Sequence, residues 1–256
     1  MSAPSAAAVI PARWASSRFP GKPLAEICGK PMIQWVVERS QRAGVLSRVI
    51  VATDDVRIRD AVHAFGGEAV MTPSDLASGT DRVAHVAEKL DAEIVVNIQG
   101  DEPLIQPEAI EQLVFTLAND DEADMATLAR TVEDPAELDN LDTARVVLDA
   151  RSRALYFSRA VIPHVRDVDD RTQWPALFSF YDQIGIYAYW RDRLLQFRQL
   201  PPSNLERAEK LEQLRALEQG WKIKVAVGPF FAFSVDIPDH IAWVENRMRE
   251  AGLLEE

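Results

Sequence analysis

Residues 94–103 read Ile-Val-Val-Asn-Ile-Gln-Gly-Asp-Glu-Pro, an apolar run that ends in a turn and an acid. A short run of this kind, rich in β-branched residues, is typical of a strand buried on both faces. Similar runs occur at 8–10, 48–52 and 69–71, and amphipathic segments of helical period separate them at 31–43, 56–65, 80–90 and 107–118. This alternation predicts an α/β fold, a three-layer αβα sandwich around a mostly parallel sheet.

The second half of the chain has a less regular pattern. We expect strands at 145–148, 185–189 and 222–227, an exposed loop at 165–174 and a last helix at 238–250. A further helix is predicted over 205–219, because Glu206 and Lys210 are spaced i, i+4 and Gly220 is a typical stop. A single domain over residues 8–252 accounts for these elements, and residues 1–7 are expected to form a flexible tail.

The composition excludes several classes of protein. Lys plus Arg is 28 and Asp plus Glu is 40, so the formal net charge of the 256 residues is −12. An acidic chain is a poor partner for nucleic acid or an anionic membrane, both of which need a basic face. A single cysteine, Cys28, excludes an intrachain disulfide and fits a cytoplasmic location. No apolar run approaches the roughly 20 residues that a membrane span needs.

Three cations, Arg13, Arg18 and Lys22, stand close together in the loop that follows the first predicted strand. Ligands of open α/β sheets bind at the carboxyl ends of the strands, so this loop faces the expected crevice. Small residues and cations together suit a polyphosphate. The loop matches neither the P-loop nor the G-x-G-x-x-G pattern. A solvated loop with scattered cations is the alternative.

Two carboxylates follow predicted strands. Asp101 ends the run at 94–98, and Asp236 lies before the last helix. Mg²⁺ takes oxygen ligands, usually one or two carboxylates with substrate phosphates and water. Taken singly, Asp101 also fits a turn and Asp236 a helix start. Together they would complete a metal site, although the sequence does not show that the two meet.

These stretches together resemble the 3-deoxy-manno-octulosonate cytidylyltransferase family, also called CMP-KDO synthetases. The resemblance runs in family order through VIPARWASSRFPGKPLAEICGKPMIQWV (9–36), VATDD (51–55), SGTDR (78–82), VNIQGDEPLI (96–105), ARVVLDARSRALYFSRAVIP (144–163), GIYAY (185–189), LEQLRALEQG (211–220) and VDIPD (235–239). It implies a Rossmann-like nucleotidyltransferase sheet and a homodimer, with a dimerisation and sugar-side arm at about 142–189. The implied reaction transfers CMP from CTP to an acidic sugar, KDO, with Mg²⁺ and releases pyrophosphate; the product would supply lipopolysaccharide synthesis.

The resemblance also implies roles for individual residues. The catalytic set is Arg13, Arg18, Lys22 and Asp101, and the metal ligands are Asp101 and Asp236. The nucleotide side comprises Ala12, Ser17, Ser78, Gly79, Gln99 and Gly100, and the acceptor side comprises Arg159, Gln183, Tyr187, Glu212 and Gln213. The acceptor-side residues also have structural readings: Arg159 could pair with a surface acid, Tyr187 could belong to the core, and either Glu212 or Gln213 must face solvent if both lie on a helix.

Two departures from the family pattern concern the acceptor. Gln183 stands where the family usually has histidine, and glutamine cannot become cationic. Ser234-Val-Asp-Ile-Pro-Asp-His240 replaces the usual Gly-Val-Asp-Thr-Pro-Glu-Asp. These changes leave open the same CMP transfer to amino-KDO, to another 2-keto-3-deoxy sugar acid or to a phosphonate. A non-catalytic nucleotide-binding protein is a third hypothesis.

Overall fold

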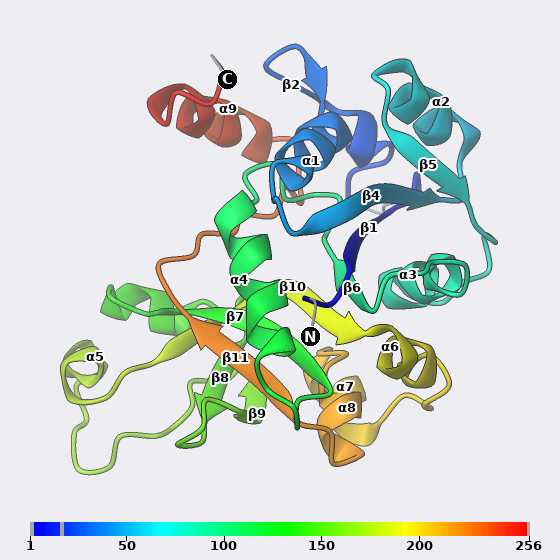
Figure 1. The fold of residues 1–256 in the computed structure, drawn as a ribbon. Helices are drawn as coiled ribbons and strands as arrows, with labels where there is room; N and C mark the ends of the chain where they lie inside the picture. Colours follow the sequence, from blue (N-terminus) through cyan, green and yellow to red (C-terminus); the bar gives the residue numbers. More distant parts are fainter. Residues whose placement is uncertain (1–2, 16–17, 255–256) are drawn as a thin grey trace.

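The structure, a computed structural model, describes residues 3–15 and 18–254. Its central sheet has the strand order β11-β7-β10-β6-β1-β4-β5 (Figure 1). These strands span Ala6–Ala12 (β1), Leu46–Thr53 (β4), Glu68–Met71 (β5), Ile94–Asn97 (β6), Met125–Thr131 (β7), Tyr181–Trp190 (β10) and Ile223–Val227 (β11). The helices span Met32–Gln41 (α1), Val56–Ala64 (α2), Gly79–Ala87 (α3), Pro107–Ala118 (α4), Trp174–Leu177 (α5), Arg191–Phe197 (α6), Asn204–Glu209 (α7), Leu214–Glu218 (α8) and His240–Glu250 (α9).

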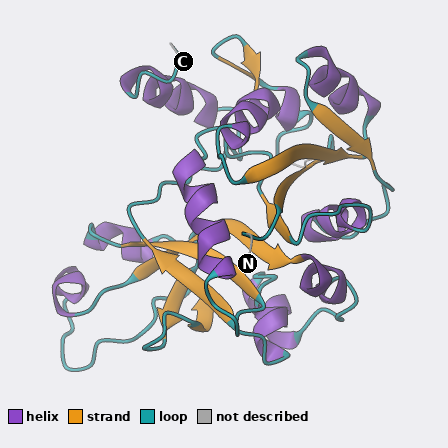
Figure 2. Cartoon of the chain, in the orientation of Figure 1, coloured by secondary structure: helices purple, strands orange, loops and turns teal. Residues whose placement is uncertain are grey.

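The sheet is covered on both faces, as the alternation of apolar runs predicts. Successive strand residues point to opposite faces, so Ala8 and Ile10 of β1 pack with helices α1, α2 and α4. Ala7 and Val9 pack on the other face, with α3, α6 and α8. Figure 2 shows helices flanking the strands of the sheet. The predicted three-layer α/β sandwich is therefore confirmed.

The sheet is parallel except around one long strand. Strands β1, β4, β5 and β6 pair in parallel, as do β7 and β11. Strand β10 lies antiparallel between β6 and β7. It is longer than the strand predicted at 185–189, and it belongs to the central sheet. The arm predicted at about 142–189 therefore contains a strand of the central sheet, and its strand β8 pairs with β10.

The remaining arm holds strands β8 (Arg145–Leu148) and β9 (Ala154–Ser158), a 3₁₀ turn (Arg171–Gln173) and helix α5. A small cluster stabilises it, in which Trp174 stacks on Phe180 with ring centroids 6.0 Å apart. The indole N–H of Trp174 donates to the carbonyl of Val168 over 2.8 Å. Trp174 is therefore a buried anchor at the end of the segment 165–174, which the sequence pattern predicts as an exposed loop.

Two other boundaries differ from the predictions. Ala6 and Ala7 are buried strand residues, so they do not belong to the tail predicted over residues 1–7. The helix predicted over 205–219 is divided into α7 and α8. The expected Glu206–Lys210 pair is absent from the described residues, and Glu206 instead accepts two hydrogen bonds from Arg215, of 2.8 and 2.6 Å.

Two short strands, β2 (Glu26–Ile27) and β3 (Lys30–Pro31), and the 3₁₀ turns at Lys22–Leu24 and Pro135–Asp139 complete the described elements. Helix α9 packs on α1 through Val244 and Met248 in a separate apolar cluster. Within residues 3–15 and 18–254, no helix is long and apolar enough to cross a membrane.

Candidate functional site

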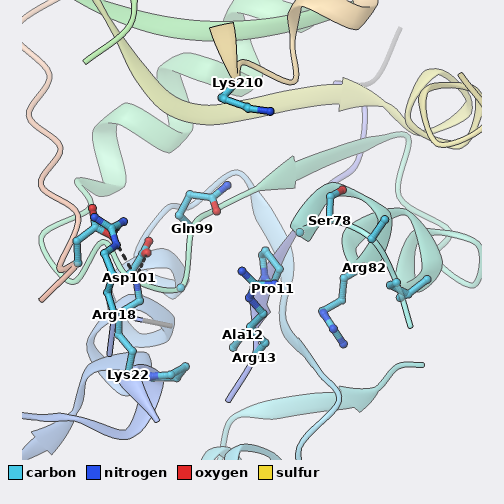
Figure 3. Close-up of a pocket in the computed structure, with 16 residues that line it drawn as sticks. Pro11, Ala12, Arg13, Arg18, Lys22, Ser78, Arg82, Gln99, Asp101 and Lys210 are labelled. Atoms are coloured by element: carbon cyan, nitrogen blue, oxygen red, sulfur yellow. Dashed lines mark hydrogen bonds and ion pairs between the residues drawn. The ribbon is translucent and has the colours of Figure 1, made fainter. Parts of the chain in front are cut away.

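A cavity of about 790 Å³ opens where β1 and β6 end and α3 begins (Figure 3). This is the carboxyl edge of the parallel strands, where the fold predicts a ligand crevice. The lining includes the following residues singled out from the sequence: Ala12, Arg13, Arg18, Lys22, Ser78, Gly79, Gln99, Gly100, Asp101 and Asp236. Ser17 lies outside the described residues. The structure thus brings together the predicted nucleotide and metal residues, which come from four separate segments of the chain.

A close approach of two strand ends shapes the floor of the cavity. A Cβ atom on Gly100 would lie 2.9 Å from the backbone oxygen of Pro11, closer than a real Cβ contact. Only glycine therefore lets the turn after β6 pass this close to the end of β1. Asp101 follows Gly100 in this turn, and Arg13 directly follows the last residue of β1. The missing side chain sets the spacing between the carboxylate and the basic loop.

The two predicted metal ligands do meet. The ammonium group of Lys22 contacts a carboxylate oxygen of Asp101 and lies 3.6 Å from Asp236 Oδ1. The backbone N–H of Val235 donates to the carbonyl of Asp101 over 2.9 Å, which fixes the two segments side by side. Arg18 adds an ion pair of 3.0 Å to Asp236. Both carboxylates therefore converge on one point at the mouth of the basic loop.

This pair suits a metal that is shared with a substrate. Within residues 3–15 and 18–254 there is no group of three or more His, Cys, Asp and Glu side chains that could hold a metal by protein ligands alone. Mg²⁺ usually takes one or two carboxylates and completes its shell with phosphate oxygens and water. Asp101 and Asp236 are two such hard oxygen donors beside the cations Arg18 and Lys22, so the donor set fits Mg²⁺.

The start of α3 forms another wall. Ser78 caps the helix, and its hydroxyl accepts a 3.1 Å hydrogen bond from the N–H of Asp81. Helix N-termini favour anions because their N–H groups and dipole point outward. Arg82 also lines this wall, and its guanidinium is buried in an ion pair of 3.0 Å with Asp54. Sequence reasoning missed Arg82, although the quoted SGTDR segment contains it.

Comparison with known proteins agrees with this geometry. A sequence model of the cytidylyltransferase family matches residues 7–223. The 3-deoxy-manno-octulosonate cytidylyltransferase of Syntrophotalea carbinolica is 51% identical over 247 residues, which cover 96% of this chain and 99% of the relative. The chain belongs to the 3-deoxy-manno-octulosonate cytidylyltransferase family. It is a CTP-dependent nucleotidyltransferase.

Other members and neighbours of this cytidylyltransferase family widen the comparison. The 8-amino-3,8-dideoxy-manno-octulosonate cytidylyltransferase of Shewanella amazonensis is 50% identical over 245 residues, covering 94% of this chain and 97% of the relative. A solved CMP:2-keto-3-deoxy-manno-octonic acid synthetase complexed with CTP has a TM-score of 0.89 at 43% identity, covering 96% and 99% of the two chains. The inositol-1-phosphate CTP transferase from T. maritima, at 15% identity and a TM-score of 0.66, shares the fold.

None of the five predicted acceptor-side residues lines the cavity, and two of them, Gln183 and Gln213, lie in a polar network. Gln213 donates to the side-chain oxygen of Gln183 over 3.4 Å, and Gln183 donates to the hydroxyl of Thr127 over 3.0 Å. Gln213 is buried and Glu212 is half-buried, in the turn between α7 and α8. The expectation that one of them faces solvent from a helix is therefore wrong.

A second set of hydrogen bonds links Glu212 to the cavity lining. The carboxylate of Glu212 accepts a hydrogen bond from the hydroxyl of Thr80. That hydroxyl in turn accepts a hydrogen bond of 3.3 Å from the side-chain amide of Asn97. Gln99, which lines the cavity, donates to Asn97 over 3.4 Å. Burial raises the pKa of Glu212, while hydrogen bonds from Thr80 and Ser78 oppose the rise. Burial and the charge of Glu212 also raise the pKa of Tyr187.

The side chain of Arg159 hydrogen-bonds to backbone carbonyls rather than pairing with a surface acid. Its guanidinium donates to the carbonyls of Glu209, Leu141 and Asp142 over 3.0, 3.1 and 2.9 Å. These bonds tie the end of α7 to the loop before β8. Acceptor binding by Arg159, which the family resemblance implies, stays a prediction. The contacts described show that Arg159 stabilises the local backbone.

Proposed function

We propose that this enzyme transfers CMP from CTP to 3-deoxy-manno-octulosonate, with Mg²⁺, to give CMP-KDO and pyrophosphate. The convergence of Asp101 and Asp236 on Lys22, at the mouth of a cationic loop, carries the proposal. Relatives that are about half identical over nearly the whole chain act as named on this acceptor or on its 8-amino form. The product would supply lipopolysaccharide synthesis.

The chemistry is an in-line displacement at the α-phosphorus of CTP. The anomeric hydroxyl of the acceptor forms the new P–O bond and releases its proton, while the bond to the β-phosphate oxygen breaks. Arg13, Arg18 and Lys22 would neutralise the triphosphate and the leaving pyrophosphate. Such reactions depend mainly on positioning and charge neutralisation. Asp101 and Asp236 would hold Mg²⁺, which when bound polarises the α-phosphate.

Gln183 favours the second candidate, CMP transfer to a different acid. It stands where the family usually has a histidine, and its amide is engaged by Thr127 and Gln213. A neutral amide has no charge to offer the acceptor. The relatives that act on the 8-amino form make that acid the first alternative to test.

The test is pyrophosphate release from CTP and Mg²⁺ with KDO, with 8-amino-3,8-dideoxy-manno-octulosonate or with neither. We expect release that depends on KDO and that EDTA abolishes. Asp101→Asn and Asp236→Asn should each lower the rate roughly 10²–10³-fold, by analogy with the loss of an electrostatic contact to the transition state. Asp121→Asn, a change at an exposed acid away from the cavity, is the matched control.

The outcomes separate the hypotheses. Release with the 8-amino acid alone would move the assignment to the second candidate. CTP binding without release across a panel of sugar acids and phosphonates would indicate a non-catalytic nucleotide-binding protein.

We also propose a homodimer formed through the arm. Three large apolar side chains of the arm, Leu155, Leu177 and Phe178, are exposed in the single chain, as is Leu141 directly before it. Exposed apolar surface of this kind favours association. Light scattering should give about twice the mass of the chain, and Leu155→Glu should shift the mass toward one chain. A monomeric wild-type protein at micromolar concentration would contradict the proposal.

A further inference from the structure

Lys210 lines the same cavity from the wall opposite the basic loop. In Figure 3 it enters from the ribbon above Gln99, while Arg13, Arg18 and Lys22 lie below Gln99. It ends α7, at the position where the predicted helix divides in two. Where the sequence pattern predicts a continuous helix with a Glu206–Lys210 pair, the break places Lys210 at the cavity instead.

The backbone of Lys210 is held in a conformation that costs energy. Its φ of 56° and ψ of 41° are left-handed, which is unfavourable for a residue with a side chain. Such conformations persist where the surroundings impose them, and they occur often at functional sites. The contacts of the residues on either side of Lys210 explain its left-handed backbone.

Both neighbours of Lys210 are anchored. The carboxylate of Glu209 accepts hydrogen bonds from the hydroxyl of Ser158 over 2.6 Å and from the N–H of Arg159 over 2.9 Å. On the other side, Leu211 is buried in the main core. These two anchors flank the residue at which the chain turns. The turn fixes where the lysine side chain leaves the backbone.

The ammonium group of Lys210 also lacks a carboxylate partner in the part of the chain that the structure describes. Among the cations that line the cavity, Arg18 and Lys22 pair with Asp101 or Asp236, and Arg82 pairs with Asp54. Arg13 and Lys210 have no ion-pair partner within residues 3–15 and 18–254. These two free cations come from opposite walls. The cavity therefore offers one positive charge on the triphosphate side and a second one across from it.

We propose that the ammonium group of Lys210 binds the carboxylate of the acceptor, an inference that rests on the proposed function. In a 2-keto sugar acid the carboxylate is attached to the anomeric carbon, next to the attacking hydroxyl. In-line attack places this hydroxyl opposite the leaving pyrophosphate, which the basic loop neutralises. The acceptor carboxylate then comes to the far wall, where Lys210 supplies its counter-charge.

Three substitutions and a control test this role through pyrophosphate release. Lys210→Met removes the charge, Lys210→Arg keeps it, and Lys210→Gly removes it while accepting the left-handed backbone. Lys89→Met changes another exposed lysine, outside the cavity lining. We expect the Met and Gly variants to raise KM for the acceptor roughly 10- to 100-fold, as for a lost charge-assisted hydrogen bond. KM for CTP should stay at the wild-type value, and Lys210→Arg should recover most of the acceptor affinity.

The measurements distinguish failure of this inference from failure of the proposed function. A rise in KM for CTP would overturn the inference by placing Lys210 on the triphosphate. Unchanged constants in all three Lys210 variants of an active enzyme would overturn it too, and would leave the proposed function standing. Wild-type enzyme that is silent with every acceptor would refute the proposed function and this inference with it.

Discussion

Gly100→Ala is the sharpest test of how the fold sets the site. The added Cβ would meet the oxygen of Pro11 at 2.9 Å, and it would also lie 3.5 Å from Ile10 and Ile33 side-chain atoms. An ordinary contact begins at 3.4 Å, so the ends of β1 and β6 must separate by about 0.5 Å. Gly100 is not among the glycines with positive φ, so the effect is steric alone.

We expect that separation to cost roughly 1–3 kcal/mol of stability, the usual range for overpacking. In a chain of this size, each kcal/mol lowers Tm by about 2–4 °C. Activity should fall further than stability predicts, because Asp101 follows Gly100 directly. A displacement of 1 Å can cost about 10²-fold in rate, so half of that distance predicts about 10-fold in kcat.

The measurements are thermal unfolding and the steady-state rate of pyrophosphate release. Gly44→Ala is the control, because its Cβ would meet the flexible carboxylate of Glu111 at 3.5 Å, an ordinary contact. It should be neutral, or stabilising by up to about 1 kcal/mol through the unfolded state. Wild-type Tm and kcat in Gly100→Ala would refute the reasoning, because the strand ends could then separate without consequence.

Three further predictions concern other parts of the chain. Asp120 pairs with Arg153 at 2.8 Å, and this pairing holds the pKa of Asp120 below its usual range although burial opposes the shift. The pair therefore stabilises the fold above the pKa of the unfolded state, and this stabilisation is lost as pH falls through the pKa of the folded state. Asp120→Asn should be less stable than wild type in urea at pH 7, and the difference in stability should disappear in acid. Arg159→Met loses three hydrogen bonds to backbone carbonyls and should lower the free energy of unfolding by roughly 1–3 kcal/mol. Urea denaturation measures this, and an unchanged unfolding midpoint would contradict a structural role for Arg159. Trp174→Ala should cost roughly 3–5 kcal/mol and lower the mass seen by light scattering if the arm joins two copies, with KM for CTP unchanged; a raised KM for CTP would show that the arm supports the nucleotide site.

The elements of the first half of the chain could be predicted closely because local signals agree with the tertiary environment. Helix α4 matches the predicted residues 107–118, with Pro107 at its first turn. The buried parts of strands β1, β4 and β6 are mostly apolar because helices cover both faces of the sheet. The crevice follows from topology alone, so the placement of Asp101 beside the basic loop needed no knowledge of side-chain contacts.

The second half follows long-range contacts, which a local pattern does not contain. Strand β10 is antiparallel and pairs with β6 and β7, whose paired residues lie 50 to 96 positions earlier in the sequence. Its length depends on those partners rather than on its own composition. The meeting of Asp101 with Asp236 was likewise beyond the sequence, because a backbone bond from Val235 to Asp101 brings the two segments together.

The divided helix shows how tertiary anchors override local propensity, and what the site gains. Residues 205–219 have helix formers throughout, and Glu206 and Lys210 have the spacing of a stabilising pair worth about 0.2–0.5 kcal/mol. Against this stand the hydrogen bonds of Glu209 to β9 and the burial of Leu211, which together outweigh one exposed ion pair. The result turns Gln213 into the core and Lys210 toward the cavity. A local break in a favourable helix is therefore the feature that brings Lys210 to the cavity wall opposite the basic loop (Figure 3).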